Sequence, residues 1–258
     1  MSPYLSRITL YPFKSLDGQD VEEAVVARNA GLRHDREYCL LDENGVVFNT
    51  KRLGEALVRI RSEVHFGFGE ITLRDASGEQ TFSLERGRER IEQWFSARLG
   101  QAVNLARDPE RGFPDDRDAS GPTLISTATL EEVGSWFGLE VDETRRRFRA
   151  NLEISGVPAF WEDRLYGPLG ETVRFRIGEV AIEGVNPCAR CTVPSRDSHG
   201  GEIGEPQFAR IFADKRRDTL PPWADPSRFD HFYRLSVNTR VPESEAGKEL
   251  RVSDEVEL

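Results

Sequence analysis

The sequence predicts an α+β protein that is mostly β. Short stretches in which apolar and polar residues alternate recur from one end of the chain to the other. Few stretches are expected to be helical, chiefly 88–99, 130–137 and 208–212. Asn44-Gly45, between two apolar runs, is a typical hairpin turn because both residues accept positive φ. Many short strands with few helices favour a β-barrel-rich fold.

The first part of the chain is expected to form strands joined by turns, followed by one helix. Alternation predicts strands over 7–11, 21–26, 38–41, 46–48, 57–66, 70–74 and 81–84. In the helix 88–99 the apolar residues form one stripe, and Gly100 is its expected stop.

A change of composition to Asp, Pro, Arg and Gly over 107–121 indicates a domain boundary. A short strand, 123–126, then leads into the helix 130–137. Thr129 and Glu132 have capping-box spacing, with Thr127 as an alternative cap. Further strands are expected over 150–154, 173–177, 180–185, 232–237 and 250–258.

Composition and charge exclude several classes of protein. The chain has 258 residues, a formal net charge of −10 and three cysteines. The acidic balance argues against nucleic-acid binding, and three cysteines do not make a disulfide framework. We find no signal peptide, N-terminal anchor or apolar stretch near the ~20 residues that span a membrane. A cytoplasmic protein with no membrane partner is expected.

The segment 186–194 holds two of the three cysteines, in a C-x-R-C arrangement. It follows the alternating run 180–185, and Asn186-Pro187 is expected to break that strand because proline has no N–H for the ladder. Cys188, Arg190 and Cys191 should therefore lie on a loop at the rim of a sheet, where functional sites are common.

The residues alone leave the role of these thiols open. A structural zinc site would need four ligands, and neither a second cysteine pair nor suitably spaced histidines are present. A thioredoxin-like dithiol should begin a helix, but Pro194 and a polar stretch follow. A disulfide or two idle thiols remain possible. So does a thiolate that binds the soft metal of a cofactor, with Arg190 lowering its pKa and binding an anionic part of the ligand.

The pattern Pro187-Cys188-Ala189-Arg190-Cys191 with Asp197 resembles the signature of MOSC proteins (the molybdenum cofactor sulfurase C-terminal fold). More narrowly, it resembles the branch of the mitochondrial amidoxime reducing component and its bacterial relatives. The resemblance implies that Cys191 is the molybdenum ligand and the catalytic residue.

Three further segments carry the resemblance, in the same order along the chain. Tyr11-Pro12-Phe13-Lys14-Ser15 is similar to Y-P-x-K-S, 31–36 to G-L-x-x-D-R, and 148–151 to F-R-P-N with alanine in place of proline. Without the resemblance, Lys14-Ser15 is an ordinary turn and Asp35-Arg36 a local ion pair. With it, the implied cofactor-binding residues are Lys14, Ser15, Arg36, Ser120, Arg149, Asn151, Arg190 and Cys191.

Some positions are ambiguous or depart from the family. Arg145 to Arg147 favour a solvated helix face. Glu162 and Asp163 either orient arginines, line the substrate side or have a structural role. Phe232 stands where some relatives have an active-site tyrosine, which argues against a mechanism that needs a phenol.

The fold that the resemblance implies is a MOSC β-barrel, closed by both chain ends, with an inserted MOSC N-terminal-type β-rich domain. We assign 1–36 and 112–258 to the barrel and 37–111 to the insert. The implied cofactor is molybdenum–molybdopterin (Moco); pyridoxal phosphate is not expected.

The implied activity is that of a molybdenum-dependent oxidoreductase that reduces small N-hydroxylated compounds. A Moco carrier or sulfur-transfer module without turnover is the alternative, and a metal-free thiol oxidoreductase is a third possibility. Cys39 is the one cysteine outside the loop, too few for a [2Fe–2S] cluster with four thiolates. We therefore expect electrons from a separate electron-transfer protein and a flavin reductase.

Overall fold

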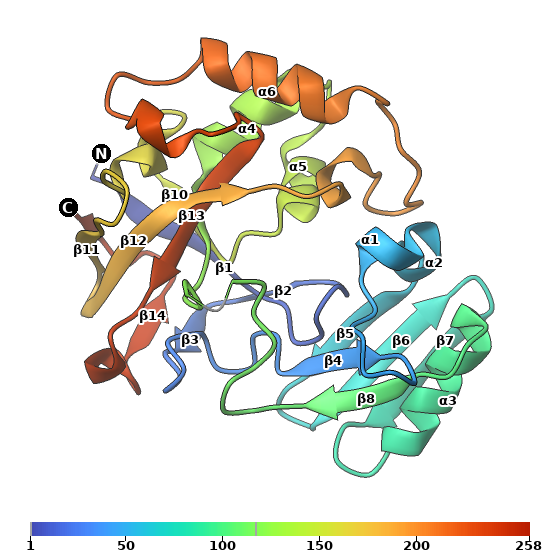
Figure 1. The fold of residues 1–258 in the computed structure, drawn as a ribbon. Helices are drawn as coiled ribbons and strands as arrows, with labels where there is room; N and C mark the ends of the chain where they lie inside the picture. Colours follow the sequence, from blue (N-terminus) through green and yellow to red (C-terminus); the bar gives the residue numbers. More distant parts are fainter. Residues whose placement is uncertain (1, 117) are drawn as a thin grey trace.

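The computed structural model describes residues 2–116 and 118–258. The chain forms a larger part and a smaller part that lie side by side (Figure 1). The larger part contains an eight-stranded sheet, a two-stranded sheet and three helices, and the smaller part contains two small sheets and three more helices. The prediction of a mixed, mostly sheet α+β protein is confirmed.

The large sheet has the strand order β15-β11-β12-β13-β9-β10-β1-β2. In this order the strands are Val256–Glu257, Val173–Ile177, Val180–Ala189, Arg234–Arg240, Leu124–Ser126, Leu152–Ser155, Tyr4–Leu10 and Gln19–Val21. All neighbours are antiparallel except β9 and β10, which are parallel. Alternate side chains of these strands, such as Ile8, Ile154 and Ile182, fill one core.

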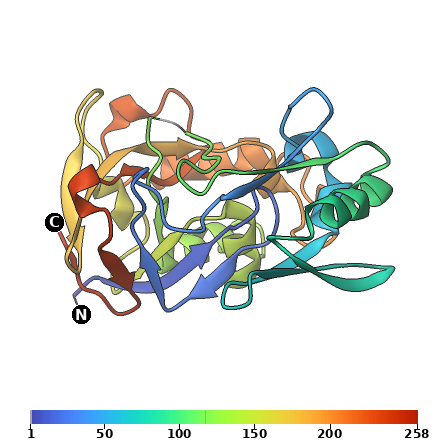
Figure 2. The same cartoon turned by 90° about the horizontal axis from the view of Figure 1, so that it is seen from below.

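The two ends of the chain meet in the larger part. The amide of Leu5 donates to the carbonyl of Asp254 (2.8 Å), and that of Val256 donates to Pro3 (2.9 Å). Close by, β3 (Glu23–Val25) pairs with β14 (Glu249–Arg251). Figure 2 shows both termini at the end of the molecule far from the smaller part. The sheet of the described strands nevertheless ends at β2 and β15, so the expected closed barrel is not established.

The smaller part has its own hydrophobic core. The strands β4 (Tyr38–Leu41) and β8 (Asn104–Arg107) form one pair, and β5 (Arg61–His65), β6 (Glu70–Asp75) and β7 (Gly78–Ser83) form a meander. The helices are α1 (Thr50–Leu53), α2 (Glu55–Val58) and α3 (Arg88–Leu99). Phe13 and Leu16, from the first segment of the chain, also belong to this core. The division at residues 37 and 111 stays a prediction.

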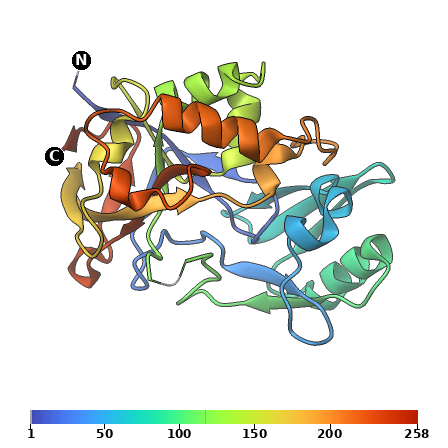
Figure 3. The same cartoon turned by 45° about the horizontal axis from the view of Figure 1, so that its top comes forward.

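Three helices cover the larger part: α4 (Thr127–Ser135), α5 (Val141–Phe148) and α6 (Phe208–Asp218). Phe148, Phe208 and Phe212 pack with Leu130 and Val133 in one cluster, which joins the helices. Figure 3 shows α6 lying across the other two helices. Short 3₁₀ turns lie at Trp161–Arg164 (η1), Val193–Ser195 (η2), Pro226–Arg228 (η3) and Glu243–Glu245 (η4). In the described ranges, no helix is long and apolar enough to cross a membrane.

The strand before the cysteines differs from the prediction. Asn186-Pro187 was expected to end it, but β12 runs on to Ala189 and pairs with β13. The register shifts between Gly184 and Asn186 and again between Pro187 and Ala189. These irregularities accommodate a proline, which cannot donate to the ladder. Cys188 therefore lies on an irregular strand end, and only Arg190 and Cys191 lie beyond it.

Several other element predictions are wrong in detail. The cap of α4 is Ser126, whose hydroxyl accepts the amide of Thr129, so neither Thr127 nor Thr129 is the cap. The range 57–66 begins as helix α2 rather than as a strand, and 250–258 contains two short strands instead of one. Helix α6 extends to Asp218, well beyond the expected 208–212.

Candidate functional site

A cleft with a volume of about 910 Å³ gathers residues from both parts of the molecule. Its walls come from the turn after β1, helix α1, the segment 111–121, the end of α5 and the cysteine segment. All eight residues predicted to bind a cofactor line it: Lys14, Ser15, Arg36, Ser120, Arg149, Asn151, Arg190 and Cys191. The structure thus brings together positions that span most of the sequence.

The cleft is strongly basic, although the chain has a net charge of −10. Its described lining includes nine lysines and arginines against four aspartates. The cations are Lys14, Lys51, Arg36, Arg111, Arg147, Arg149, Arg190, Arg228 and Arg234. Five of them have no carboxylate within 4.0 Å in the described part of the chain: Lys51, Arg111, Arg149, Arg190 and Arg228. Such a concentration of positive charge favours an anionic ligand.

Asn151 is the centre of a buried network that holds Arg36. Its amide nitrogen donates to the carbonyl of Thr9 and to Asp35 Oδ1, both at 3.0 Å, while its oxygen accepts Arg36 Nη1 at 3.2 Å. Asp35 pairs with Arg36 and also accepts the amide of Tyr11 at 2.8 Å. Asn151 is therefore occupied by the protein, and it fixes the direction of the Arg36 guanidinium.

Arg149 is the residue that ends α5, and its φ of 54° is left-handed. The guanidinium lies 4.2 Å from the centre of the Tyr11 ring, and Arg36 lies 5.3 Å from the same ring. Burial lowers the pKa of Arg149, and the nearby charge of Arg36 lowers it further. A desolvated cation without a carboxylate partner among the described residues is a ready site for an anion.

Lys14 is held by the linker segment. Its ammonium donates to the carbonyls of Phe113 (2.9 Å) and Pro114 (3.3 Å) and pairs with Asp115 at 2.8 Å. Desolvation raises the pKa of Asp115, but the charges of Arg36 and Lys14 outweigh it, so the pKa is lowered. The carboxylate of Asp115 therefore lies where an anionic ligand would interact with Lys14 and Arg36.

Two serines add hydroxyl groups to the cleft. Ser120 Oγ donates to the carbonyl of Asn29 at 3.0 Å, and its lone pairs can accept a further donor. Ser15 has a left-handed φ of 72°, and its hydroxyl has no hydrogen-bond partner among the described residues.

The two thiols of the cysteine segment have different surroundings. Cys191 Sγ accepts the amide of Val193 at 3.5 Å, and both Cys188 and Cys191 are half-buried and free. Arg190 Nη1 donates to Cys188 Sγ and to Ser236 Oγ, each at 3.3 Å, and the other nitrogen donates to the carbonyl of Phe148. The guanidinium thus lies against Cys188 rather than against the proposed metal ligand Cys191.

A buried phenol lies close to the same segment. Burial raises the pKa of Tyr233, Arg190 opposes the rise, and a negative charge on Cys191 adds to it. The hydroxyl of Tyr233 has no hydrogen-bond partner in the described part of the chain. Phe232 itself stacks on Phe229, with ring centres 5.4 Å apart.

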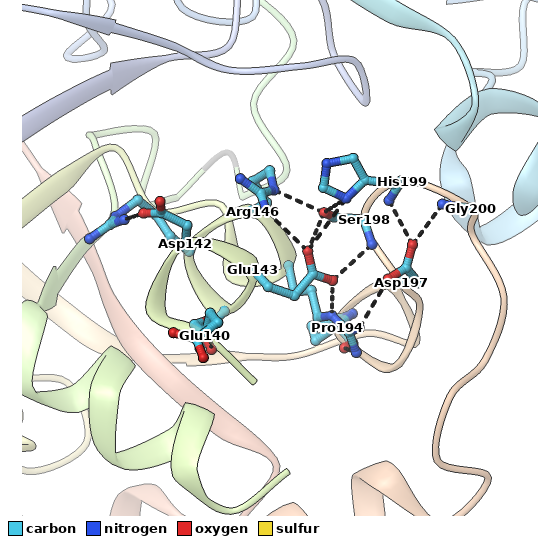
Figure 4. Close-up of polar contacts among 12 residues, drawn as sticks. Glu140, Asp142, Glu143, Arg146, Pro194, Asp197, Ser198, His199 and Gly200 are labelled. Carbon is cyan, nitrogen blue, oxygen red and sulfur yellow. Dashed lines mark hydrogen bonds and ion pairs between the residues drawn. The ribbon is translucent and has the colours of Figure 1, made fainter. Parts of the chain in front are cut away.

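Outside the cleft, two acidic side chains and a histidine lie close enough together to suggest a cation site. Glu143, Asp197 and His199 present ligand atoms within 4.8 Å of one another (Figure 4). Arg147 pairs with both carboxylates, and Arg146 lies 3.4 Å from Glu143. Because the two guanidiniums already neutralise the acids, this trio gives no argument for a cation.

A second cavity, of about 530 Å³, adjoins the cleft and shares Ser15, Thr50, Arg147, Arg149 and Val193 with it. Most of its arginines pair with acids: Arg7 with Asp20, Arg61 with Asp17, and Arg145 with Glu153. Its charges are therefore largely balanced, unlike those of the cleft.

Sequence reasoning missed five of the nine cations that line the cleft. One of them, Arg147, was expected on a solvated helix face, but it is 7% exposed and pairs with Glu143. Lys51, Arg111, Asp115, Arg228 and Arg234 belong to no spacing that predicts a site. For Arg111 and Asp115 a signal existed, since both lie in the segment 107–121 that was interpreted only as a domain boundary. Arg228 donates to the carbonyls of Gly167, Pro168 and Val185, contacts that only the folded chain creates.

The chain thus combines an α+β fold with a cleft that contains a thiol and an excess of positive charge suited to an anionic ligand. Residues 118–257, more than half of the chain, match the MOSC domain, and residues 2–86 match the MOSC N-terminal beta barrel domain. The chain belongs to the MOSC domain family.

Curated relatives carry the name molybdenum cofactor sulfurase. The chain is 28% identical over 224 residues to that of Drosophila grimshawi, covering 74% of this chain and 28% of the relative. It is 27% identical over 233 residues to that of Drosophila melanogaster, covering 78% and 29%. The chain thus spans less than a third of the length of these relatives.

Solved structures resemble the chain only distantly. One, described as the crystal structure of a hypothetical protein, has a TM-score of 0.45 at 12% identity. The match covers 99% of this chain and 68% of the other chain. The YUAD protein from Bacillus subtilis has a TM-score of 0.40 at 10% identity and covers 99% and 94%.

Proposed function

We propose that the cleft binds Moco and that the protein is a molybdenum-dependent oxidoreductase that reduces small N-hydroxylated compounds. The observation that carries the proposal is the thiol of Cys191 in the same cleft as nine lysines and arginines. Thiolates bind soft transition metals, and the planar fork of arginine suits a phosphate. Membership of the MOSC family and relatives that are molybdenum cofactor sulfurases support the same ligand.

The residues present fit such a cofactor. Cys191 would ligate the metal, while Arg149, Arg36 and Lys14 would bind the phosphate and the two serines would bond polar atoms. The cleft volume of about 910 Å³ suits a cofactor of this size. The desolvated Arg149 gains most, since an anion would provide the partner that the described residues do not.

Two of the eight residues would act through others. The amide of Asn151 is already bonded to Thr9, Asp35 and Arg36, so its part is to hold Arg36 toward the ligand. Arg190 is bonded to Cys188, Ser236 and Phe148, so its part is to fix the strand end that carries the thiols.

When bound, molybdenum would supply the two-electron reduction of the N–O bond, with two protons and loss of water. The chain supplies the anion site, the thiolate ligand and the geometry of the pocket. Electrons would come from a separate electron-transfer protein and a flavin reductase.

The test is an assay with a hydroxylamine substrate and three sources of electrons. Protein loaded with molybdenum should turn over with a reduced artificial dye, and also with a flavoprotein reductase plus its carrier protein. With NADH or NADPH alone it should be inactive. No reduction with the dye would contradict the reductase activity, while turnover with NADH alone would contradict the proposed route of electrons.

A second candidate, a Moco carrier or sulfur-transfer module, is favoured by Cys188. Its half-exposed thiol accepts a hydrogen bond from Arg190 Nη1 at 3.3 Å, and it lies in the same cleft as Cys191, where it could carry a persulfide. A carrier should lose its cofactor on dialysis, whereas an enzyme retains it and changes its absorbance on reduction.

A further inference from the structure

The chain after Cys191 folds back as a tight turn, residues 197–203, which we call the docking turn. The amide of Asp197 donates to Glu202 O (2.8 Å), and that of Gly201 donates to Asp197 O (3.0 Å). Asp197 Oδ1 also accepts the amides of Gly200 (2.7 Å) and His199 (2.9 Å), and these bonds lower the pKa of Asp197. Asp197 is the aspartate of the cysteine signature, yet it does not line the cleft. In this structure Asp197 stabilises the turn through these hydrogen bonds.

One side of the docking turn is attached to α5 (Figure 4). Glu143 accepts the amide of Ser198 at 2.9 Å, and Arg146 Nε donates to Ser198 Oγ at 3.0 Å. The buried Arg147 pairs with Asp197 at 3.7 Å. The turn is thus tied to the helix whose end carries Arg149.

The other side is attached to the smaller part of the molecule. A Cβ on Gly201, whose φ is +81°, would meet Glu55 Cα at 2.6 Å, so the backbones of the turn and of α2 are in close contact. Arg59 Nε donates to Gly200 O at 3.2 Å, and its terminal nitrogen pairs with Glu202 at 3.1 Å. Arg61 donates to Ser198 O at 3.2 Å.

The link between the docking turn and Cys191 is short and stiff. It contains the 3₁₀ turn η2 with the buried Pro194, whose ring fixes its φ. Arg147 donates to Pro194 O at 3.5 Å, and the amide of Val193 donates to the Cys191 thiol itself. These contacts form a short, continuous path from the docking turn to the thiol of Cys191.

We propose that the smaller part positions the thiol of Cys191 in the cleft by holding the docking turn. Arg59 and Gly201 are then positioning residues: neither lines the cleft, and both act on Cys191 through the docking turn. The purpose of this positioning, which is to place the thiol where it can ligate a metal, rests on the proposed function. The coupling between the smaller part and the thiol does not.

The experiment measures the rate at which a neutral maleimide labels Cys191 in protein purified without its cofactor. Peptide mapping by mass spectrometry separates Cys191 from Cys188, and Cys39 is fully buried. Arg59→Ala should raise the rate about fivefold, because an exposed ion pair and a hydrogen bond that hold the turn are lost. Arg74→Ala is the matched control: its side chain is 58% exposed against 57% for Arg59, and its partner Glu79 lies within the smaller part.

A second pair of variants changes the turn itself. Gly201→Ala should raise the labelling rate, whereas Gly204→Ala should not, since no atom of the described residues lies within 4 Å of a Cβ added there. Urea unfolding of each variant distinguishes a displaced turn from a destabilised protein. Rates for Arg59→Ala and Gly201→Ala within twofold of their controls, or a rise explained by lower global stability, would overturn the proposal.

Molybdenum analysis of the loaded protein separates this inference from the proposed function. Wild-type protein that never retains molybdenum would contradict the proposed function, while the labelling result would still decide the coupling. If molybdenum is retained, the positioning variants should also shift the thiolate-to-metal absorption band.

Discussion

Three residues that line the cleft have left-handed backbones although none of them is glycine. Ser15, Arg36 and Arg149 have φ values of 72°, 50° and 54°. This conformation costs roughly 1–2 kcal/mol for a residue with a Cβ, and such strain gathers at functional sites. At Arg149 the turn that ends α5 directs the side chain over Tyr11. The left-handed backbone conformations thus accompany side chains that line the cleft.

Substitution of Arg149 separates this strain from its function. Arg149→Gly and Arg149→Ala should both lose the cofactor phosphate, because charge-assisted bonds worth about 1.5–3 kcal/mol disappear. Arg149→Gly should be more stable than Arg149→Ala by about 1 kcal/mol, because only glycine accepts the left-handed φ without cost. Pterin and phosphorus analysis measures the first effect, and urea unfolding measures the second.

Arg174→Ala serves as the control, since that side chain is 82% exposed and does not line the cleft. A full complement of cofactor in either Arg149 variant would show that this guanidinium does not bind it. Equal stabilities of the glycine and alanine variants would contradict the backbone argument.

Among the elements, the 3₁₀ turn η1 and helices α4 and α6 enclose an acidic pair in the protein interior. Glu162 Oε2 accepts the hydroxyl of Thr129 at 3.0 Å, whereas Oε1 has no partner in the described part of the chain. Asp163 pairs with Arg216, which is 1% exposed. Burial, and then the charge of Asp163, raise the pKa of Glu162 from 4.5 to about 7. The protonated form of Glu162 is therefore the one that the fold prefers.

This raised pKa makes stability depend on pH. The contribution of Glu162 is fully present below its unfolded pKa and is lost as the pH rises through the folded value of about 7. Glu162→Gln, which cannot ionise, should therefore be more stable than wild type at alkaline pH, by up to about 3 kcal/mol. Near pH 4.5 the two should differ little.

Urea unfolding of both proteins across this pH range gives the difference directly. Glu131→Gln on the exposed face of α4 is the control, and it should follow wild type. A stability difference for Glu162→Gln that does not grow with pH would mean that this carboxyl ionises as easily in the fold as in the unfolded chain.

Some helices and strands could be predicted from the sequence and others could not. Helix 88–99 was predicted with its bounds, because Ile91, Trp94 and Phe95 form a buried stripe and Gly100 takes a left-handed φ of 67°. The strand through Pro187 was not predicted, because the register shifts that tolerate proline depend on the partner β13. Ser126, not Thr129, caps α4, since β9 brings Ser126 to the start of the helix.

For the whole molecule, the order of the motifs indicated which residues would meet, and they do line one cleft. The excess of positive charge in that cleft could not be predicted, because Lys51, Arg111 and Arg228 come from separate segments of a chain with net charge −10. Contact between α2 and the docking turn was equally invisible, since it depends on how two hydrophobic cores are packed. The motifs predicted which residues line the candidate site. The packing of the chain determines the charge of the cleft and the contacts that hold the docking turn.

We propose that Cys191 is the ligand through which this molecule holds molybdenum. The most direct test is the molybdenum content, by mass spectrometry, of wild-type protein, Cys191→Ser and Cys188→Ser produced in parallel from a host that makes Moco. We expect molybdenum in wild type, most of it retained in Cys188→Ser, and a large loss in Cys191→Ser. Equal molybdenum in Cys191→Ser and wild type would contradict it.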